Sequence, residues 1–134
     1  MTLYHGSNVI VEMPNLVLSR KNLDFGFGFY TTENREQAVA FAQKVMIRKE
    51  QKNQRVSVYD FDEDSAESVL DILRFPSIGK LWLDFVHQNR RGTYVEQTLD
   101  ALKVKDLYSQ FVFKTEKALS FLRYVNSFEP EAVP

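Results

Sequence analysis

The sequence contains no cysteine and only two histidines, His5 and His87. A chain without cysteine forms no disulfides and has neither thiolate metal ligands nor a cysteine nucleophile. Two histidines are too few for a histidine-rich metal site, so we expect no bound metal. The formal net charge of −1 provides no overall attraction for nucleic acid or for an anionic membrane.

Long apolar runs are also absent. None approaches the about 20 residues that a membrane-spanning helix needs, and the N-terminus lacks the basic region and apolar core of a secretory signal. We therefore expect a cytoplasmic protein without a membrane partner. The composition, 44% hydrophobic and 26% charged over 134 residues, is that of one ordinary globular domain. We place this domain at residues 1–128 and expect residues 129–134 to form a frayed tail.

Hydrophobic patterning indicates three strands and one long helix in the first half of the chain. The expected strands are Thr2–Tyr4, which ends at a turn over His5–Asn8, the pair Phe29 and Tyr30, and Val56–Phe61, which is followed by a turn at Asp62–Asp64. The helix is expected over Glu33–Gln51, with Thr31 or Thr32 as its N-cap. Its apolar residues recur at helical spacing: Ala38, Phe41, Ala42, Val45 and Met46.

The second half of the chain predicts three further helices and one further strand. The helices are expected over Gly79–Asn89, Val95–Lys103 and Glu116–Leu122, the last capped by Thr115, and the strand over Tyr108–Phe113. The inward-facing residues of the first helix should be Leu81, Trp82, Phe85 and Val86. Val69–Phe75 fits a short helix or a strand, and Pro76 ends it. Because the elements do not alternate as regular βαβ units, the predicted fold class is α+β.

Three short motifs contain residues that are unusual for their positions. The first, YHGSN at residues 4–8, places a histidine between an aromatic residue and a glycine. The second, FGFGFYTT at residues 25–32, alternates glycine with phenylalanine, and the third, YSQFVFK at residues 108–114, puts Gln110 into an alternating strand. Taken singly, each motif has a structural interpretation: a structural histidine, a bulged strand with aromatic residues in the core, and a buried glutamine that needs partners.

Together, the three motifs resemble the signature of the ADP-ribosyltransferase superfamily, in the His-Tyr-Glu branch that includes the diphtheria-toxin and poly(ADP-ribose) polymerase catalytic domains. The segments LYHGSN, LDFGFGFYTTENREQA and QFVFKTEKAL are most similar to a family of small, uncharacterised bacterial members of that superfamily. The resemblance covers nearly the whole chain and implies a split β-sheet core with flanking helices. One strand that these relatives carry has no counterpart here, since Gly92 is followed directly by TYVEQTLDAL.

The resemblance implies NAD as co-substrate. Such enzymes break the bond between nicotinamide and ribose through a transition state with oxocarbenium character, so the ribose must be oriented and the developing charge stabilised. By resemblance, His5 would hydrogen-bond a ribose hydroxyl of the adenosine half of NAD. The backbone of Gly6, in the same motif as Ser7, would bind the carboxamide of the nicotinamide, which requires a close approach.

The second motif would close over the nicotinamide ring. Gly28 and Phe29 belong to this covering segment, and Tyr30 matches the signature tyrosine that stacks on the ring. Phe41 falls where the relatives carry a second aromatic residue, so Tyr30 and Phe41 could enclose the ring between them. For Phe41, ordinary core packing is the alternative.

Gln110 stands where active relatives carry a glutamate that faces the developing cation. A carboxylate about 4 Å from a unit positive charge contributes on the order of 4 kcal/mol at an effective dielectric of 20, and its loss lowers the rate roughly 10³-fold. Glutamine still accepts a hydrogen bond from a ribose hydroxyl, and the related family commonly has glutamine here. Glu116 could supply the missing charge, although a carboxylate that stabilises the start of a helix is the alternative.

Three functions follow as hypotheses. The first is a mono-ADP-ribosyltransferase that modifies a protein or nucleic acid, serving as a bacterial toxin with an antitoxin partner or in phage defence. The second is an NAD- or ADP-ribose-binding module that has lost its chemistry at Gln110. The third is an RNA 2′-phosphotransferase, which shares the fold and uses NAD but needs a more basic site. His87, Arg90 and Arg91 belong to no motif and fit a solvated helix.

Overall fold

The computed structural model describes residues 1–16, 27–50, 52–75, 80–91, 99–105 and 109–130, and within the 80–91 segment it describes the side chains of residues 83–88. The strands are β1 (Thr2–Ser7), β2 (Phe29–Thr32), β3 (Arg55–Phe61), β4 (Ile72–Phe75), β5 (Ala101–Lys105), β6 (Ser109–Phe113) and β7 (Leu122–Phe128). The helices are α1 (Arg35–Arg48), α2 (Glu63–Glu67), α3 (Lys80–Arg91) and α4 (Glu116–Leu119). This mixture confirms the predicted α+β class.

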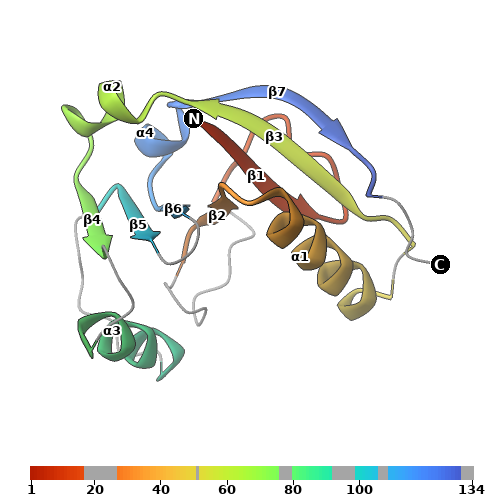
Figure 1. The fold of residues 1–134 in the computed structure, drawn as a ribbon, viewed down its shortest axis with the longest axis horizontal. Helices are drawn as coiled ribbons and strands as arrows, with labels where there is room; N and C mark the ends of the chain where they lie inside the picture. The colour runs from red at the N-terminus through yellow and green to blue at the C-terminus, as the bar shows by residue number, and fades with distance from the viewer. Residues whose placement is uncertain (17–26, 51, 76–79, 92–98, 106–108, 131–134) are drawn as a thin grey trace.

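The strands form one mixed sheet in the order β4-β5-β6-β2-β1-β3-β7 (Figure 1). Only β4 and β5 run parallel; the other neighbouring strands are antiparallel. The first motif lies on β1, the second leads into β2 and the third lies on β6. The topology therefore brings the three motifs onto adjacent strands at the centre of the sheet.

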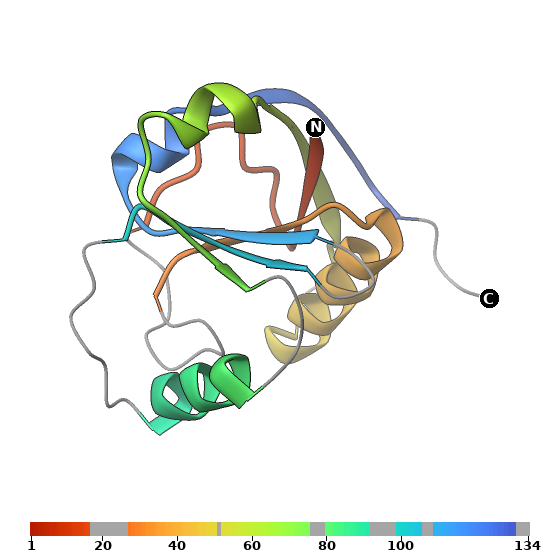
Figure 2. The same cartoon turned by 60° about the vertical axis from the view of Figure 1, so that its left-hand side comes forward.

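Helices cover both faces of the sheet. Figures 1 and 2 show α1 and α3 on one face and α2 and α4 on the other. On the α2/α4 face, Ala66, Ala118 and Leu119 pack against a cluster of buried aromatic residues that includes Phe111 and Phe113. The α1/α3 face has two smaller apolar clusters, one under each helix. The core is thus divided by the sheet.

The pairing between β1 and β2 is unusually short. These strands pair at one position, Tyr4 with Thr32, whereas β1 pairs with β3 along its whole length and β2 pairs with β6 throughout. The sheet therefore consists of two well-paired halves that meet at what we call the β1–β2 seam. Helix α1 packs on β1 and β3, in one half, and α3 packs on β5 and β6, in the other.

Helix α1 begins one position after its N-cap, Asn34, whose Oδ1 accepts the Gln37 N–H at 2.7 Å. The predicted cap at Thr31 or Thr32 is wrong, because both threonines belong to β2. Thr32 instead supports the cap, since its hydroxyl accepts the Asn34 N–H and donates to Gln37 Oε1 at 2.6 Å. The helix ends at Arg48, before the predicted end, and Glu50 follows with φ 53°, a left-handed conformation typical of helix ends.

Several other elements match the sequence prediction. These are β2, β3 and β6 in their described parts, α3, and the α4 cap, where Thr115 Oγ1 accepts the Ala118 N–H at 3.1 Å. In α3, Val86 is buried and Phe85 half-buried as predicted, whereas the side chains of Leu81 and Trp82 lie outside the described residues. Val69–Phe75 contains a strand, Ile72–Phe75.

Four predictions in regular structure are wrong. The first strand continues through the expected turn to Ser7, because β3 pairs with all of it. Asp62–Asp64 is the start of α2, with Asp62 as N-cap. The described part of the predicted helix Val95–Lys103 contributes to β5, since pairing with β4 and β6 buries Ala101 and Leu102 and outweighs helix propensity. Helix α4 stops at Leu119, so that Leu122 begins β7.

Two residues of the predicted frayed tail, Glu129 and Pro130, lie within the described part of the chain. Glu129 forms an ion pair with Arg55 at 3.2 Å, and Pro130 is buried. Residues 131–134 lie outside the described part of the chain.

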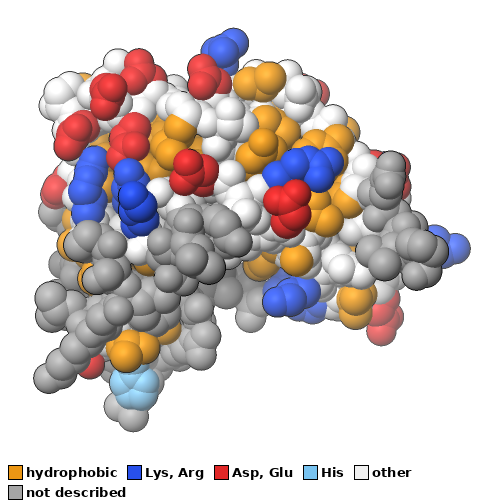
Figure 3. All heavy atoms as spheres, viewed as in Figure 1, with side chains coloured by type: hydrophobic (Ala, Val, Ile, Leu, Met, Phe, Trp, Pro, Cys, Tyr) orange, Lys and Arg blue, Asp and Glu red, His pale blue; other side chains and the backbone are white. Residues whose placement is uncertain are grey.

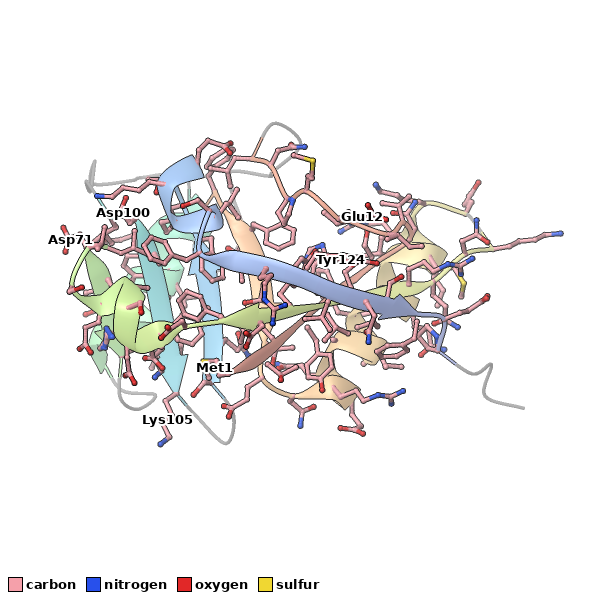
Figure 4. The ribbon with its side chains drawn as sticks, turned by 90° about the horizontal axis from the view of Figure 1, so that it is seen from above. Met1, Glu12, Asp71, Asp100, Lys105 and Tyr124 are labelled. Atoms are coloured by element: carbon pink, nitrogen blue, oxygen red, sulfur yellow. The ribbon has the colours of Figure 1, made fainter. Side chains whose placement is uncertain are left out.

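Charged side chains of both signs lie together on the surface. Glu63 of α2 binds Lys103 of β5 at 2.6 Å and Arg74 of β4 at 3.6 Å, and Figure 3 shows the two signs side by side over α2 and β4. Asp71 directly precedes β4, and Asp100 directly precedes β5. The two residues are neighbours (Figure 4), and the Asp71 N–H donates to Asp100 Oδ2 at 3.0 Å. These contacts fix α2 against β4 and β5.

Among the described residues, no group of three or more histidine, cysteine or acidic side chains could hold a metal ion. No described helix is long and apolar enough to cross a membrane.

Candidate functional site

His5 connects the first two motifs directly. Its Nδ1 lies 2.6 Å from the carbonyl oxygen of Tyr30, and its ring stacks on Phe29 with centroids 4.1 Å apart. Both contacts cross the β1–β2 seam. They lie just beyond the pair Tyr4 and Thr32, where backbone pairing between the two strands stops. The His5 side chain therefore links the two halves of the sheet where strand pairing does not.

The hydrogen bond fixes the protonation of the His5 ring. A carbonyl oxygen only accepts, so Nδ1 must carry the proton that it donates to Tyr30. Burial lowers the pKa of His5 from its usual value, although the Tyr30 hydrogen bond acts in the opposite direction. The ring is therefore neutral near pH 7, and Nε2 is a hydrogen-bond acceptor.

The segment after the first motif packs over the same face as His5. The Val11 N–H donates to Ser57 Oγ at 3.0 Å, and the Val11 carbonyl accepts from the Tyr59 hydroxyl at 2.5 Å. Burial raises the pKa of Tyr59, so this hydroxyl keeps its proton. Two side chains of β3 thus hold this segment against the sheet.

Gly6 and Gly28 are both closely surrounded by protein atoms. A Cβ at Gly6 would lie 2.1 Å from Ala38 O and 2.8 Å from Ala42 N, both in the backbone of α1. A Cβ at Gly28 would lie 2.4 Å from Val112 Cγ1. The absence of a side chain at these positions is therefore explained by the packing of β1 on α1 and of the second motif on β6.

Tyr30 and Gln110 share one face of the sheet. Thr32 is the cross-strand partner of both Tyr4 and Gln110, and Tyr30 is the partner of Val112, so these side chains project to the same side. Tyr30 packs on the cluster under α3, which identifies this side as the α1/α3 face. Gln110 is half-buried, and no hydrogen bond of its side chain is found within the described part of the chain.

His5 and Phe29 belong to the opposite face. Phe29 alternates with Tyr30 along β2 and packs with Tyr59 in the aromatic cluster of the α2/α4 face. The structure thus brings His5, Tyr30 and Gln110 onto adjacent strands but directs His5 to one face and the other two to the other. A ligand that contacts all three must pass through the β1–β2 seam.

Three further residues named from the sequence are Ser7, Phe41 and Glu116. The Ser7 hydroxyl donates to Asn8 Oδ1 at 3.3 Å. Phe41 is 45% exposed on α1, so core packing does not explain it. Glu116 is in the first turn of α4, beyond the far end of β6 from Gln110. Among the described residues of α3, His87 is exposed, and the side chains of Arg90 and Arg91 fall outside the description.

Two charged residues near the site were not singled out from the sequence. Lys114 Nζ donates to Phe27 O at 2.9 Å, and burial lowers the pKa of Lys114 to about 8. Glu33 Oε2 accepts the Ser109 N–H at 3.2 Å. Lys114 is the last residue of the third motif, and Glu33 directly follows the second; this proximity is the sequence signal that could have identified them.

A family model described as "Protein of unknown function (DUF3990)" matches residues 1–97. The matched segment contains His5, Gly6, Tyr30 and Phe41 but ends before β5 and β6, so Gln110 lies outside it. No curated protein matches the chain.

Proposed function

We propose that this chain, which belongs to the DUF3990 family of proteins of unknown function, is an NAD-dependent mono-ADP-ribosyltransferase. The observation that carries the proposal is the hydrogen bond from His5 Nδ1 to Tyr30 O at 2.6 Å. This bond joins the histidine and tyrosine motifs at the β1–β2 seam, although 24 residues lie between His5 and Tyr30 in the sequence. Gln110 lies one strand further along the sheet.

The residues at the seam fit the chemistry of NAD. Neutral His5 offers Nε2 as an acceptor for a ribose hydroxyl, because its other nitrogen is committed to Tyr30. Tyr30 offers an aromatic ring for stacking on nicotinamide, and the Gln110 amide oxygen can accept from a second ribose hydroxyl. NAD would supply an ADP-ribosyl group whose bond to nicotinamide is labile.

The acceptor would be a macromolecule. We include a toxin role, with an antitoxin partner, in the proposal because members of the superfamily that the three motifs resemble have such roles. The described side chains that share the α1/α3 face of β2 and β6 with Tyr30 include Lys114 but no arginine. This favours ADP-ribosyl transfer over RNA 2′-phosphotransfer, which needs a more basic site.

Gln110 favours a second candidate function, an NAD- or ADP-ribose-binding module. Its amide carries no charge, so it can orient a ribose without stabilising a developing cation. The two candidates make different predictions: the transferase releases nicotinamide, whereas the module binds NAD and releases none.

The test is nicotinamide release from NAD by the purified protein, with and without a bacterial lysate as acceptor, beside direct measurement of NAD binding. His5→Ala removes the proposed ribose contact, and His87→Ala, on an exposed histidine of α3, is the matched control. Release that needs lysate and is lost only in His5→Ala supports the transferase. NAD binding without release, with release restored in Gln110→Glu, supports the binding module. No NAD binding by any variant refutes both.

A further inference from the structure

Glu33 provides a carboxylate next to the position where Gln110 replaces the usual glutamate. We infer that Glu33 supplies the negative charge that stabilises the developing positive charge on the ribose. The inference rests on the proposed function, and it predicts that the wild-type protein is a slow enzyme and not a binding module.

The position of the Glu33 carboxylate is fixed by β6. The Glu33 N–H donates to Ser109 O at 2.9 Å, and Glu33 Oε2 accepts the Ser109 N–H at 3.2 Å. The side chain thus takes the place of a backbone carbonyl at the end of the β2–β6 ladder, one residue beyond the pair Thr32 and Gln110. Since Ser109 and Gln110 are consecutive, covalent geometry places this oxygen within about 8 Å of the Gln110 Cα.

Glu33 keeps capacity for a further interaction. A carboxylate has two oxygens with about four acceptor positions, of which the Ser109 N–H takes one. The residue is exposed, whereas its neighbours Thr31 and Thr32 are buried. Its charge is therefore exposed at the end of the β2–β6 ladder and is not neutralised by an ion pair within the described residues.

Among the residues that the structure describes, the other carboxylates near the third motif are less well placed. Glu116 lies six residues after Gln110, beyond the opposite end of β6, and an extended chain of that length spans about 20 Å. Asp100 lies at the same end as Glu116, where it accepts from Thr115 at 2.8 Å. Glu36, in the first turn of α1, is exposed and has a charge like that of Glu33 without the contact to β6. Glu36 is thus the matched control.

In the reaction, the bond between ribose C1′ and the nicotinamide nitrogen breaks, and its electron pair leaves with nicotinamide as a neutral ring. Positive charge develops on the ribose until an oxygen of the acceptor, or of water, donates a lone pair to C1′ and releases its proton to solvent. Glu33 stays ionised throughout and forms no bond. If the ribose binds beside Gln110, a carboxylate about 8 Å from its developing charge corresponds, at an effective dielectric of 20, to roughly 30-fold in rate.

The experiment compares kcat and KM for nicotinamide release in wild type, Glu33→Gln, Glu36→Gln, Gln110→Glu and the double variant Glu33→Gln/Gln110→Glu. Glutamine at position 33 keeps an acceptor for the Ser109 N–H and removes only the charge. We expect Glu33→Gln to lower kcat roughly 30-fold with KM nearly unchanged, and Glu36→Gln to have little effect. Because Glu33 is exposed, added salt should lower the wild-type rate more than that of Glu33→Gln.

The double variant separates charge from structure. If Glu33 acts through its charge, a glutamate at position 110 restores release in the Glu33→Gln background. Wild-type release that Glu33→Gln leaves unchanged overturns the inference while the proposed function stands. NAD binding with release in Gln110→Glu but none in wild type also overturns it, in favour of the binding module. No NAD binding by any variant overturns the proposed function itself.

Discussion

Replacing Gly6 by alanine tests whether the glycine of the first motif is required by the fold or by a ligand. The new Cβ would lie 2.1 Å from Ala38 O and 2.8 Å from Ala42 N, and contacts under 3.0 Å essentially do not occur. Both neighbours belong to the backbone of α1, so no side-chain rotation relieves the overlap. Helix α1 must instead move by roughly 1 Å from the sheet on which Ala38 and Ala42 are buried.

The expected loss of stability follows from this geometry. Overpacking of a core lowers the free energy of unfolding by about 1–3 kcal/mol, and a clash with a helix backbone falls in the upper part of that range. Domains of this size have total stabilities of roughly 5–15 kcal/mol, so Gly6→Ala should still fold. With a urea m-value of about 1–3 kcal/mol/M, the unfolding midpoint should fall by about 1–2 M.

Urea unfolding followed by far-UV circular dichroism, without NAD, measures this effect. Gly28→Ala is the matched comparison, because its nearest neighbour is a side-chain atom, Val112 Cγ1 at 2.4 Å. Gly28→Ala should therefore destabilise a Val112→Ala background less than wild type. An unfolding midpoint for Gly6→Ala equal to that of wild type, together with loss of NAD binding, would refute the packing explanation and assign the glycine to the ligand.

Three further outcomes concern stability. Because burial lowers the folded-state pKa of His5 below 6.5, the unfolded chain binds more protons, and the free energy of unfolding should decrease as pH falls below about 6.5. In urea titrations between pH 7.5 and 5, His5→Phe should lose this pH dependence and His87→Ala should keep it. Equal pH dependence in His5→Phe and wild type would contradict the assignment to His5. Tyr59→Phe leaves the Val11 carbonyl without its hydroxyl donor and should lower the free energy of unfolding by about 1–2 kcal/mol, and a change below about 0.5 kcal/mol would show that the bond is dispensable. Asn34→Ala removes the acceptor for the Gln37 N–H and should lower the midpoint of thermal unfolding by an amount equivalent to about 1 kcal/mol. Asn34→Asp keeps an acceptor and should leave the midpoint unchanged. Equal losses in the two variants would exclude the cap as the cause.

Elements set by local sequence could be predicted. The spacing of the apolar residues predicts α1, although of Ala38, Phe41, Ala42, Val45 and Met46 only Ala38, Ala42 and Val45 are buried. Thr115 predicts the α4 cap. That His5, Tyr30 and Gln110 lie in one region is implied by the family resemblance and not by local sequence; the topology places β1, β2 and β6 side by side.

Elements set by pairing between distant strands could not be predicted. Leu102 and Val104 have neighbours of good helix propensity and become a strand only because β4 and β6 flank them. In β7 the alternation of exposed and half-buried residues is broken at Val125, where the pairing with β3 shifts register. The division of His5 and Tyr30 between the two faces depends on strand register, which the motif residues do not specify.

The strand order has a consequence for the synthesis of the chain. The N-terminal strand β1 lies inside the sheet, and its neighbour β3 is covered by β7. On the other side, β2 pairs with β6, although β3, β4 and β5 lie between these two strands in the chain. A ribosome therefore releases β1, β2 and α1 long before β6 and β7 exist to complete the sheet. Until Phe128 has emerged, β3 has an uncovered edge, and the nascent chain depends on slow long-range contacts and on protection from aggregation.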